Sequence, residues 1–269
     1  MVVVDTHCHA SPYWFEPVEI LLDEMTRNGV DKATLVQFFG VYDNSYLIEC
    51  MRRFPGRFSV VALVDVQRPD APEQLAQLKE QGVEGIRFNT GMRSPGRDPL
   101  AVWRKAAELG MVASVMGTVE GYAAPEFESL VKELPDLKIV IEHLGGVGAY
   151  FGPGRADKTV PYETYQTVLE LAKYPNTSMK MPGLGEFCAR PMPFRQPFPF
   201  GEVPPLIEMA IDAFSPQRLM WGSDFPPVAA REGYRNALQF PVERLQSRSE
   251  EDREWIFGKT AATLWRLGE

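Results

Sequence analysis

Residues 57–89 read RFSVVALVDVQRPDAPEQLAQLKEQGVEGIRFN, and this stretch decides the fold. Residues 57–66 form an apolar, β-branched run typical of a buried strand, and residues 84–89 form a second one. Between them, residues 71–82 repeat apolar positions at helical spacing and end in glycine, as a helix end should. A strand, a helix and a second strand in this order indicate two parallel strands joined by a helical crossover.

The same alternation runs through the whole chain. Eight strands alternating with helices in 269 residues fit a (β/α)8 TIM barrel. A doubly wound open sheet is the alternative, but no G-x-G-x-x-G motif follows the first strand. We therefore expect one barrel domain over residues 1–269, closed by helices over residues 250–268. The other predicted strands are 2–7, 32–38, 111–116, 138–143, 176–181 and 218–224, and the other helical patterns include 18–29, 99–110 and 162–174.

One segment, residues 181–205, breaks this alternation. It contains seven prolines and four phenylalanines with little periodicity, so it cannot be a regular helix or a central strand throughout. We expect an irregular insertion after the seventh strand. Because active sites of barrels lie at the carboxyl ends of the strands, the insertion could be a lid or a substrate wall as well as a rigid surface loop.

The composition bounds the function. The net charge of −8 argues against nucleic acid as the main partner. No stretch approaches eighteen apolar residues, and the N-terminus has no basic region before a long apolar run, so we expect neither a membrane span nor a signal peptide. The cysteines are three in number and far apart, at Cys8, Cys50 and Cys188. This pattern favours a reducing cytoplasm over a disulfide framework.

The chain has only three histidines, and all of them fall at predicted strand ends. His7 and His9 lie in DTHCHA (5–10), and residues i and i+2 of a strand point the same way. His143 ends the sixth predicted strand, and Asp224 ends the eighth. Because the carboxyl ends of barrel strands share one face, we expect these four side chains to converge there, where two imidazoles could hold a divalent metal or a polarised oxygen.

Three motifs carry a resemblance to a known family. In order, VDTHCH (4–9), PDLKIVIEHLGG (135–146) and MWGSDFP (220–226) resemble the amidohydrolase-related branch of the amidohydrolase superfamily. The resemblance covers nearly the whole chain and implies a distorted (β/α)8 barrel that hydrolyses its substrate with an activated water. GIRFN (85–89) is similar to the lactonase side of that branch, whereas decarboxylases and hydratases occupy the other side.

The resemblance also implies roles for these residues. His7, His9 and Asp224 match the positions that bind one divalent ion in metal-using members. Asp224 also matches the residue that takes a proton from the attacking water. His143 matches the histidine that polarises or protonates the substrate.

The sequence departs from the metal-using pattern at the end of the fifth strand. Those members carry a further histidine there, but this chain has Met116 near that position, and a thioether is a poor ligand for such an ion. The lactonase side also lacks this histidine. Strand four offers Arg87 in place of a lysine that could bridge two ions. We therefore expect at most one divalent ion, Zn²⁺ or Mn²⁺, held weakly or not at all.

Several further residues are candidates for substrate binding. Arg87 could bind a carboxylate or a lactone oxygen, or it could pair with a carboxylate of the barrel. Tyr13 and Trp14 could form a wall of the pocket or serve in packing. Lys180, at a strand-seven position, is expected to face solvent. Cys8 alternates with the histidine pair and is expected to face the helices.

These observations predict an enzyme that acts on a small molecule. The substrate could be an anion, because an arginine is predicted at the site. The leading hypothesis is a hydrolase that opens a small lactone or related ester. A metal-dependent decarboxylase or hydratase of small carboxylic acids is the alternative within the superfamily. A catalytically silent barrel that binds a ligand is the alternative from another class. A homo-oligomer is left open by the sequence.

Overall fold

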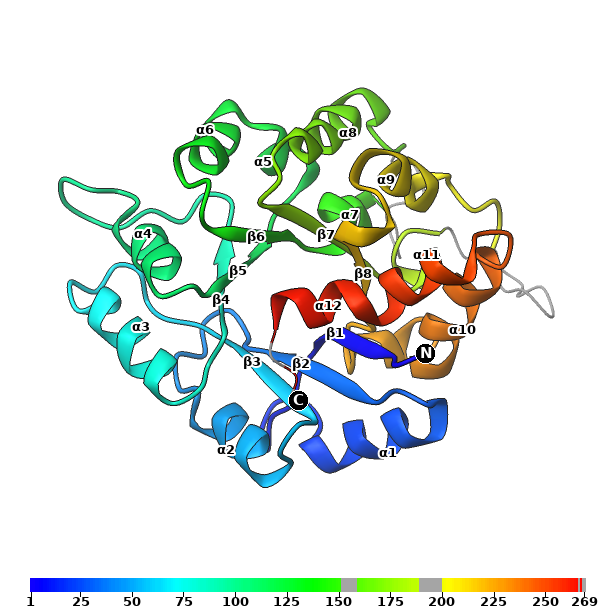
Figure 1. Ribbon diagram of the computed structural model, residues 1–269, viewed down its shortest axis with the longest axis horizontal. Coiled ribbons are helices and arrows are strands. Elements are labelled where there is room, and N and C mark those ends of the chain that lie inside the picture. Colours follow the sequence, from blue (N-terminus) through cyan, green and yellow to red (C-terminus); the bar gives the residue numbers. More distant parts are fainter. Residues whose placement is uncertain (151–158, 189–199, 266, 268–269) are drawn as a thin grey trace.

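Eight parallel strands form a barrel, as the sequence predicts (Figure 1). This computed structural model describes residues 1–150, 159–188, 200–265 and 267. Each strand pairs with the next one along the chain, from the first to the eighth. The strands are β1 (Val4–Cys8), β2 (Lys32–Val36), β3 (Phe58–Ala62), β4 (Gly85–Asn89), β5 (Val112–Met116), β6 (Lys138–Ile141), β7 (Thr177–Met181) and β8 (Leu219–Trp221).

The barrel closes between the first and last strands, just beyond the end of β8. The backbone N–H of Asp224 donates to the carbonyl of His7 at 2.8 Å, and the N–H of His9 donates to the carbonyl of Phe225 at 2.8 Å. A parallel bridge joins Cys8 to Phe225 between them. The seam of the barrel is therefore formed by the residues that carry two of the three histidines and the predicted aspartate.

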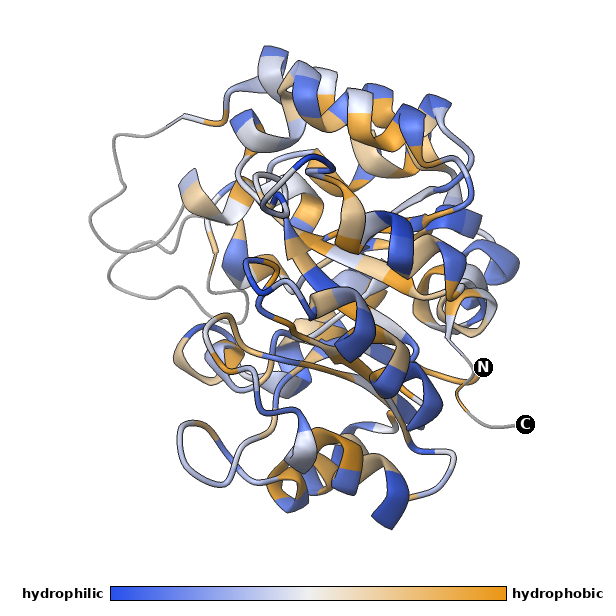
Figure 2. Cartoon of the chain, turned by 90° about the vertical axis from the view of Figure 1, so that its left-hand side faces the viewer, coloured by the Kyte–Doolittle hydropathy of each residue, from blue (hydrophilic) through white to orange (hydrophobic). Residues whose placement is uncertain are grey.

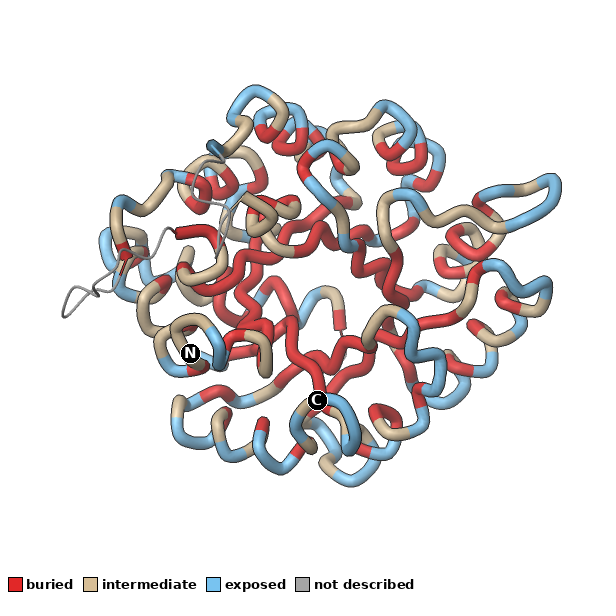
Figure 3. Tube along the Cα trace, turned by 180° about the vertical axis from the view of Figure 1, so that it is seen from behind, coloured by how far each residue is buried: buried red, intermediate tan, exposed pale blue. Residues whose placement is uncertain are grey.

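Helices surround the barrel and turn their apolar sides toward it. Figure 3 shows the buried strands inside a ring whose outer turns are exposed, and Figure 2 shows that the helices carry both hydrophobic and hydrophilic residues. The helices are α1 (Val18–Asn28), α2 (Ser45–Arg53), α3 (Ala71–Glu80), α4 (Ala101–Glu108), α5 (Val119–Ala123), α6 (Pro125–Glu133), α7 (His143–Gly146), α8 (Tyr162–Leu169), α9 (Leu206–Phe214), α10 (Tyr234–Arg244), α11 (Glu250–Glu254) and α12 (Thr260–Leu264).

Side chains alternate between the two faces of each strand. In β2, Ala33 and Leu35 belong to the large apolar core between barrel and helices, whereas Val36 belongs to a second, smaller cluster. Cys8 lies in the outer core, as predicted. The second cluster lies inside the barrel and consists of Val4, Val36, Val61, Val112, Val140, Met220, Ala261, Trp265 and Leu267.

The C-terminal segment supplies the largest side chain of that inner cluster. The segment runs from α11 through a π-helical turn over Trp255–Lys259 into α12, which crosses one end of the barrel (Figure 1). Trp265 follows α12 and is 1% exposed. A Cβ on Gly85 would lie 2.7 Å from the Val61 side chain and 3.4 Å from the Trp265 indole nitrogen, so only glycine fits beside these two side chains.

Four predicted strands extend past the carboxyl ends of the observed ones, namely 32–38, 57–66, 138–143 and 218–224. Residues 57–66 were expected in one strand, but β3 ends at Ala62; the eighth ends at Trp221, before the left-handed backbone of Asp224 (φ 58°). The predicted closing helices are present over Glu250–Leu264. In the predicted insertion 181–205, residues 189–199 lie outside the described residues. None of the helices in the described ranges has the length and apolar character needed to cross a membrane.

We expect Trp265→Ala to lower the free energy of unfolding by about 3–5 kcal/mol, because it empties the inner cluster of its largest side chain. Urea unfolding measures this loss. The matched control is Trp14→Ala, whose side chain is 74% exposed and whose loss should change stability by no more than about 0.5 kcal/mol. Equal losses in the two variants would show that Trp265 does not anchor the barrel.

Candidate active site

The histidine pair lies at the carboxyl end of β1 and is almost fully buried, with His7 1% and His9 3% exposed. Their rings make an edge contact with centroids 5.0 Å apart. The register shift in β1 between Asp5 and Cys8 turns His7 inward although Val4, three residues earlier, also faces inward. Gly222 allows the approach of the neighbouring strand, since a Cβ there would lie 2.7 Å from Cβ of His7.

Asp224 and His143 are aimed at the pair by unusual backbone. Their φ angles are 58° and 53°, in the left-handed region that residues other than glycine rarely adopt. Such strain persists only where the surrounding structure enforces it, and it gathers at functional sites. The His143 ring stands 4.5 Å from the His7 ring, centroid to centroid. The four residues predicted to converge therefore lie together at one end of the barrel.

His7, His9 and Asp224 present their ligand atoms to one another. Oδ1 of Asp224 lies 3.5 Å from Nε2 of His9 and 3.9 Å from Nε2 of His7. One ligand atom from each residue falls within 4.8 Å of the others, close enough to surround one ion. Within the described part of the chain, Nε2 of His7 is a buried polar atom without a hydrogen-bond partner. An unsatisfied nitrogen of this kind is what a bound cation would satisfy.

The protonation states of this group suit a cation. Burial lowers the pKa of His9, and burial together with the charge of Lys180 holds the pKa of His7 well below its usual range, so both imidazoles are neutral. Burial raises the pKa of Asp224, but the neighbouring His9 imidazole and the charges of His143 and Arg231 more than offset this and lower the pKa to about 2. Two neutral imidazoles and one carboxylate are the donor set of a catalytic zinc-like site.

His143 belongs to a second charged group on the rim of the site. Its Nδ1 donates to Glu186, with Oε1 at 3.0 Å. Arg231 links the two groups, because its Nη1 lies 2.9 Å from Oδ2 of Asp224 and 3.5 Å from Oε2 of Glu186. Burial lowers the pKa of His143, but the neighbouring carboxylates, Glu186 first among them, raise it to about 9. His143 is therefore a cation at neutral pH.

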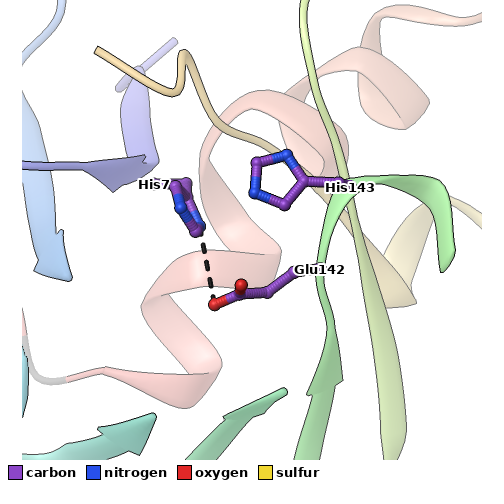
Figure 4. A group of neighbouring side chains, drawn as sticks. All are labelled: His7, Glu142 and His143. Atoms are coloured by element: carbon purple, nitrogen blue, oxygen red, sulfur yellow. Dashed lines mark ion pairs between the residues drawn. The ribbon is translucent and has the colours of Figure 1, made fainter. Parts of the chain in front are cut away.

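Below His7 lies a buried polar floor, which we define as Arg87, Ser114, Glu142 and Lys180. Figure 4 shows Glu142 facing His7 from the end of β6, with Oε1 3.6 Å from Nδ1 of His7. Ser114 donates to the same oxygen at 2.7 Å, and Arg87 donates to Oε2 at 3.2 Å. Lys180 donates to the Ser114 hydroxyl at 2.9 Å.

The structure corrects one expectation and shows where the other candidate residues lie. Lys180 was expected to face solvent, and this is wrong: it is 2% exposed, because it shares the inward face of β7. Arg87 is 5% exposed and pairs with Glu142 and with the carbonyl of Gln37, so its guanidinium serves a barrel carboxylate. Tyr13 and Trp14 are 96% and 74% exposed, and their place in a substrate pocket stays a prediction.

Other residues of the site escaped sequence reasoning. Strand alternation could have predicted Glu142, because it lies two residues after Val140, which faces into the barrel. Glu186 and Arg231 had none, since both come from loops beyond β7 and β8, where no strand alternation applies. The aromatic neighbours of His9 are Phe15 and Phe38, with ring centroids 5.8 and 4.5 Å away. The sequence directed attention to the two aromatic residues just before Phe15 instead.

Comparisons with known proteins agree with this architecture. The model of the amidohydrolase family matches residues 4–267. L-fucono-1,5-lactonase of Burkholderia ambifaria is 27% identical over 253 residues, covering 90% of this chain and 82% of that protein. The 4-sulfomuconolactone hydrolase of Rhizobium radiobacter is 24% identical over 230 residues, covering 84% and 70%. The crystal structure of an amidohydrolase from Burkholderia multivorans with bound zinc superimposes with a TM-score of 0.81 at 21% identity, and all of both chains is covered.

We expect Glu186→Gln to lower the pKa of His143 from about 9 toward its ordinary value of 6.5, because the variant loses the carboxylate that holds the proton. An NMR titration of the three histidine rings measures this. A pKa raised in the folded state stabilises the protein fully below 6.5, and that stability is lost as pH rises through about 9. Wild type should therefore exceed the variant in stability at pH 6 and lose this excess by pH 10; an unchanged excess at pH 10 would contradict the pairing.

Proposed function

This chain belongs to the amidohydrolase family, and we propose that it is a hydrolase that opens a small lactone. The observation that carries the proposal is the convergence of one carboxylate, two neutral imidazoles and one protonated imidazole at the end of a barrel. Two relatives named as lactone hydrolases, matched over most of the chain, support this substrate class. A lactone carbonyl is an ester carbonyl, which needs less polarisation than an amide.

Asp224 acts as the general base in the proposed reaction. It is ionised at neutral pH, and its Oδ1 faces the space between the imidazoles of His7 and His9. A water held there adds through its oxygen to the lactone carbonyl carbon and passes a proton to Asp224. The carboxylate is held in place by Arg231, so the base does not have to be reoriented during the reaction.

His143 acts as the electrophile and general acid. Its proton on Nδ1 is directed to Glu186, so Nε2–H is left for the substrate. That group donates to the carbonyl oxygen as negative charge develops, and then to the ring oxygen when the carbon–oxygen bond breaks. The products are a carboxylic acid and an alcohol on one chain. The arrangement of base, acid and orienting carboxylate follows the usual logic of acid–base catalysis.

His7, His9 and Asp224 would hold a single divalent ion, for which we propose Zn²⁺ or Mn²⁺. When bound, the ion would supply Lewis-acid polarisation of the water and of the carbonyl. Without it, the imidazoles of His7 and His9 still orient the water toward Asp224. Met116, 39% exposed at the end of β5, offers only a thioether.

An uncharged, hydroxyl-rich lactone fits the charges at the site better than a polyanion. Among the described residues, the two guanidinium groups at the site are already paired: Arg87 with Glu142, and Arg231 with Asp224 and Glu186. Neither guanidinium therefore needs a carboxylate of the substrate as a partner. We therefore propose a sugar lactone as the substrate class, in keeping with the fuconolactone named for one relative.

We expect Asp224→Asn and His143→Asn each to lower kcat/KM for L-fucono-1,5-lactone by about 10²–10⁴-fold, because each removes a proton-transfer group. A pH-indicator assay of acid release on a panel of sugar lactones, with one dicarboxylate lactone and small carboxylic acids, measures this. The matched control is Asp212→Asn, whose side chain is 74% exposed and outside the site. Turnover only of the carboxylic acids would replace the lactonase with a decarboxylase or hydratase, and ligand binding without any turnover would indicate a silent barrel.

Chelation should reduce but not abolish lactone hydrolysis, because the acid and base both belong to the chain. Elemental analysis before and after chelation, with activity measured on the same samples, tests this. We expect at most one ion per chain. Two tightly held ions per chain would contradict the single-ion site.

A further inference from the structure

The hydrogen bonds behind His7 and His9 run in opposite directions. A histidine that binds a metal through one ring nitrogen normally donates the N–H of the other to a carboxylate, a carbonyl or water. His9 meets this requirement, because its Nδ1 lies 2.6 Å from the carbonyl oxygen of Val36 and has to donate. Nε2 of His9 therefore carries a lone pair and faces Asp224.

His7 meets a donor instead. Its Nδ1 lies 3.3 Å from Nζ of Lys180, and the nearest oxygen of Glu142 lies farther away, at 3.6 Å. An ammonium has three donors and no acceptor, so Lys180 donates and His7 accepts. A neutral imidazole that accepts at Nδ1 carries its proton on Nε2. That proton then points into the space where an ion would bind.

The rest of the polar floor fixes this direction. The Ser114 hydroxyl has one proton, which it donates to Glu142 at 2.7 Å, so its oxygen must accept from Lys180 at 2.9 Å. Arg87 occupies the other carboxylate oxygen of Glu142. Lys180 is buried, 2% exposed, over the Trp265 ring, with Nζ 5.4 Å from the ring centroid.

We propose that Lys180 is a positioning residue that holds His7 as the Nε2–H tautomer and thereby lowers the affinity of the site for a divalent ion. Binding an ion at Nε2 requires the proton of His7 to move to Nδ1, opposite the ammonium. Nε2 of His9 can thus bind an ion directly, whereas Nε2 of His7 can do so only after its proton has moved. This inference refines the metal site of the proposed function, but it concerns only the side chains of this chain.

The tautomer itself is the first test. In chelated protein labelled with nitrogen-15, long-range proton–nitrogen NMR spectra distinguish Nδ1–H from Nε2–H for the three histidines, assigned with His9→Asn and His143→Asn. We expect His7 protonated at Nε2 and His9 at Nδ1, and saturating Zn²⁺ should move the His7 proton to Nδ1. A His7 proton at Nδ1 in the chelated protein would overturn the proposal. Because no substrate is needed, absent lactone turnover would count against the proposed function alone.

Calorimetric titration of chelated protein with Zn²⁺ is the second test. Lys180→Met should bind Zn²⁺ on the order of 10-fold more tightly, since His7 can then donate from Nδ1 to Glu142. Arg87→Met is the matched control, because it removes a cation from the same floor without touching His7. An equal gain in Zn²⁺ affinity in both variants would indicate simple charge repulsion and would overturn the proposal. No gain in affinity in Lys180→Met would overturn it as well. If Lys180→Met does not fold, the wild-type tautomer decides.

Discussion

The buried carboxylate of Asp5 holds together the seam on which the site depends. It is fully buried, and it accepts hydrogen bonds from the backbone N–H of Ser223 at 2.8 Å, the Ser223 hydroxyl at 2.6 Å, the N–H of His7 at 3.1 Å and the Tyr234 hydroxyl at 3.0 Å. Burial raises the pKa of Asp5 to about 6, so these four donors are what make the charge tolerable. Through them the first strand is fixed against the last.

This seam explains why residues from opposite ends of the chain can share one site. A barrel brings its first and last strands together, and here the junction lies at their carboxyl ends, where β8 gives way to Asp224. His7, His9 and that aspartate are therefore neighbours in the hydrogen-bonded ladder itself. Their separation is set by backbone pairing and the absence of a side chain at Gly222, and does not depend on mobile loops.

Among the described residues, three carboxylates that line the site, Glu142, Asp224 and Glu186, each face a cation. Glu142 has Arg87, whereas Asp224 and Glu186 share Arg231, and Glu186 also holds His143. Buried charges persist when they are paired in this way, and removing one member leaves its partner unpaired. Burial keeps the imidazoles of His7 and His9 neutral, whereas Glu186 keeps His143 protonated, although the rings of His7 and His143 lie only 4.5 Å apart. This separates a water-orienting role from a proton-donating one.

The sequence predicts the fold and the four converging residues because both depend on strand periodicity. The same alternation places Glu142 and Lys180 on the inward face of their strands. The prediction for Lys180 was wrong because a lysine can be buried when it joins a network around a buried carboxylate. Glu186 and Arg231 could not be predicted, because loop geometry brings them to the site. Neither could the burial of Trp265, since closing helices show no sign in sequence of which residue enters a barrel.

The left-handed backbone at His143 and Asp224 also restricts which residues evolution could place there. Apart from glycine, asparagine, aspartate and histidine tolerate this conformation best, and β-branched residues tolerate it worst. Neutral substitutions at these two positions are thus limited to a few residue types, most of which form hydrogen bonds. A descendant that lost catalysis would most easily acquire asparagine there, because this residue keeps the backbone conformation.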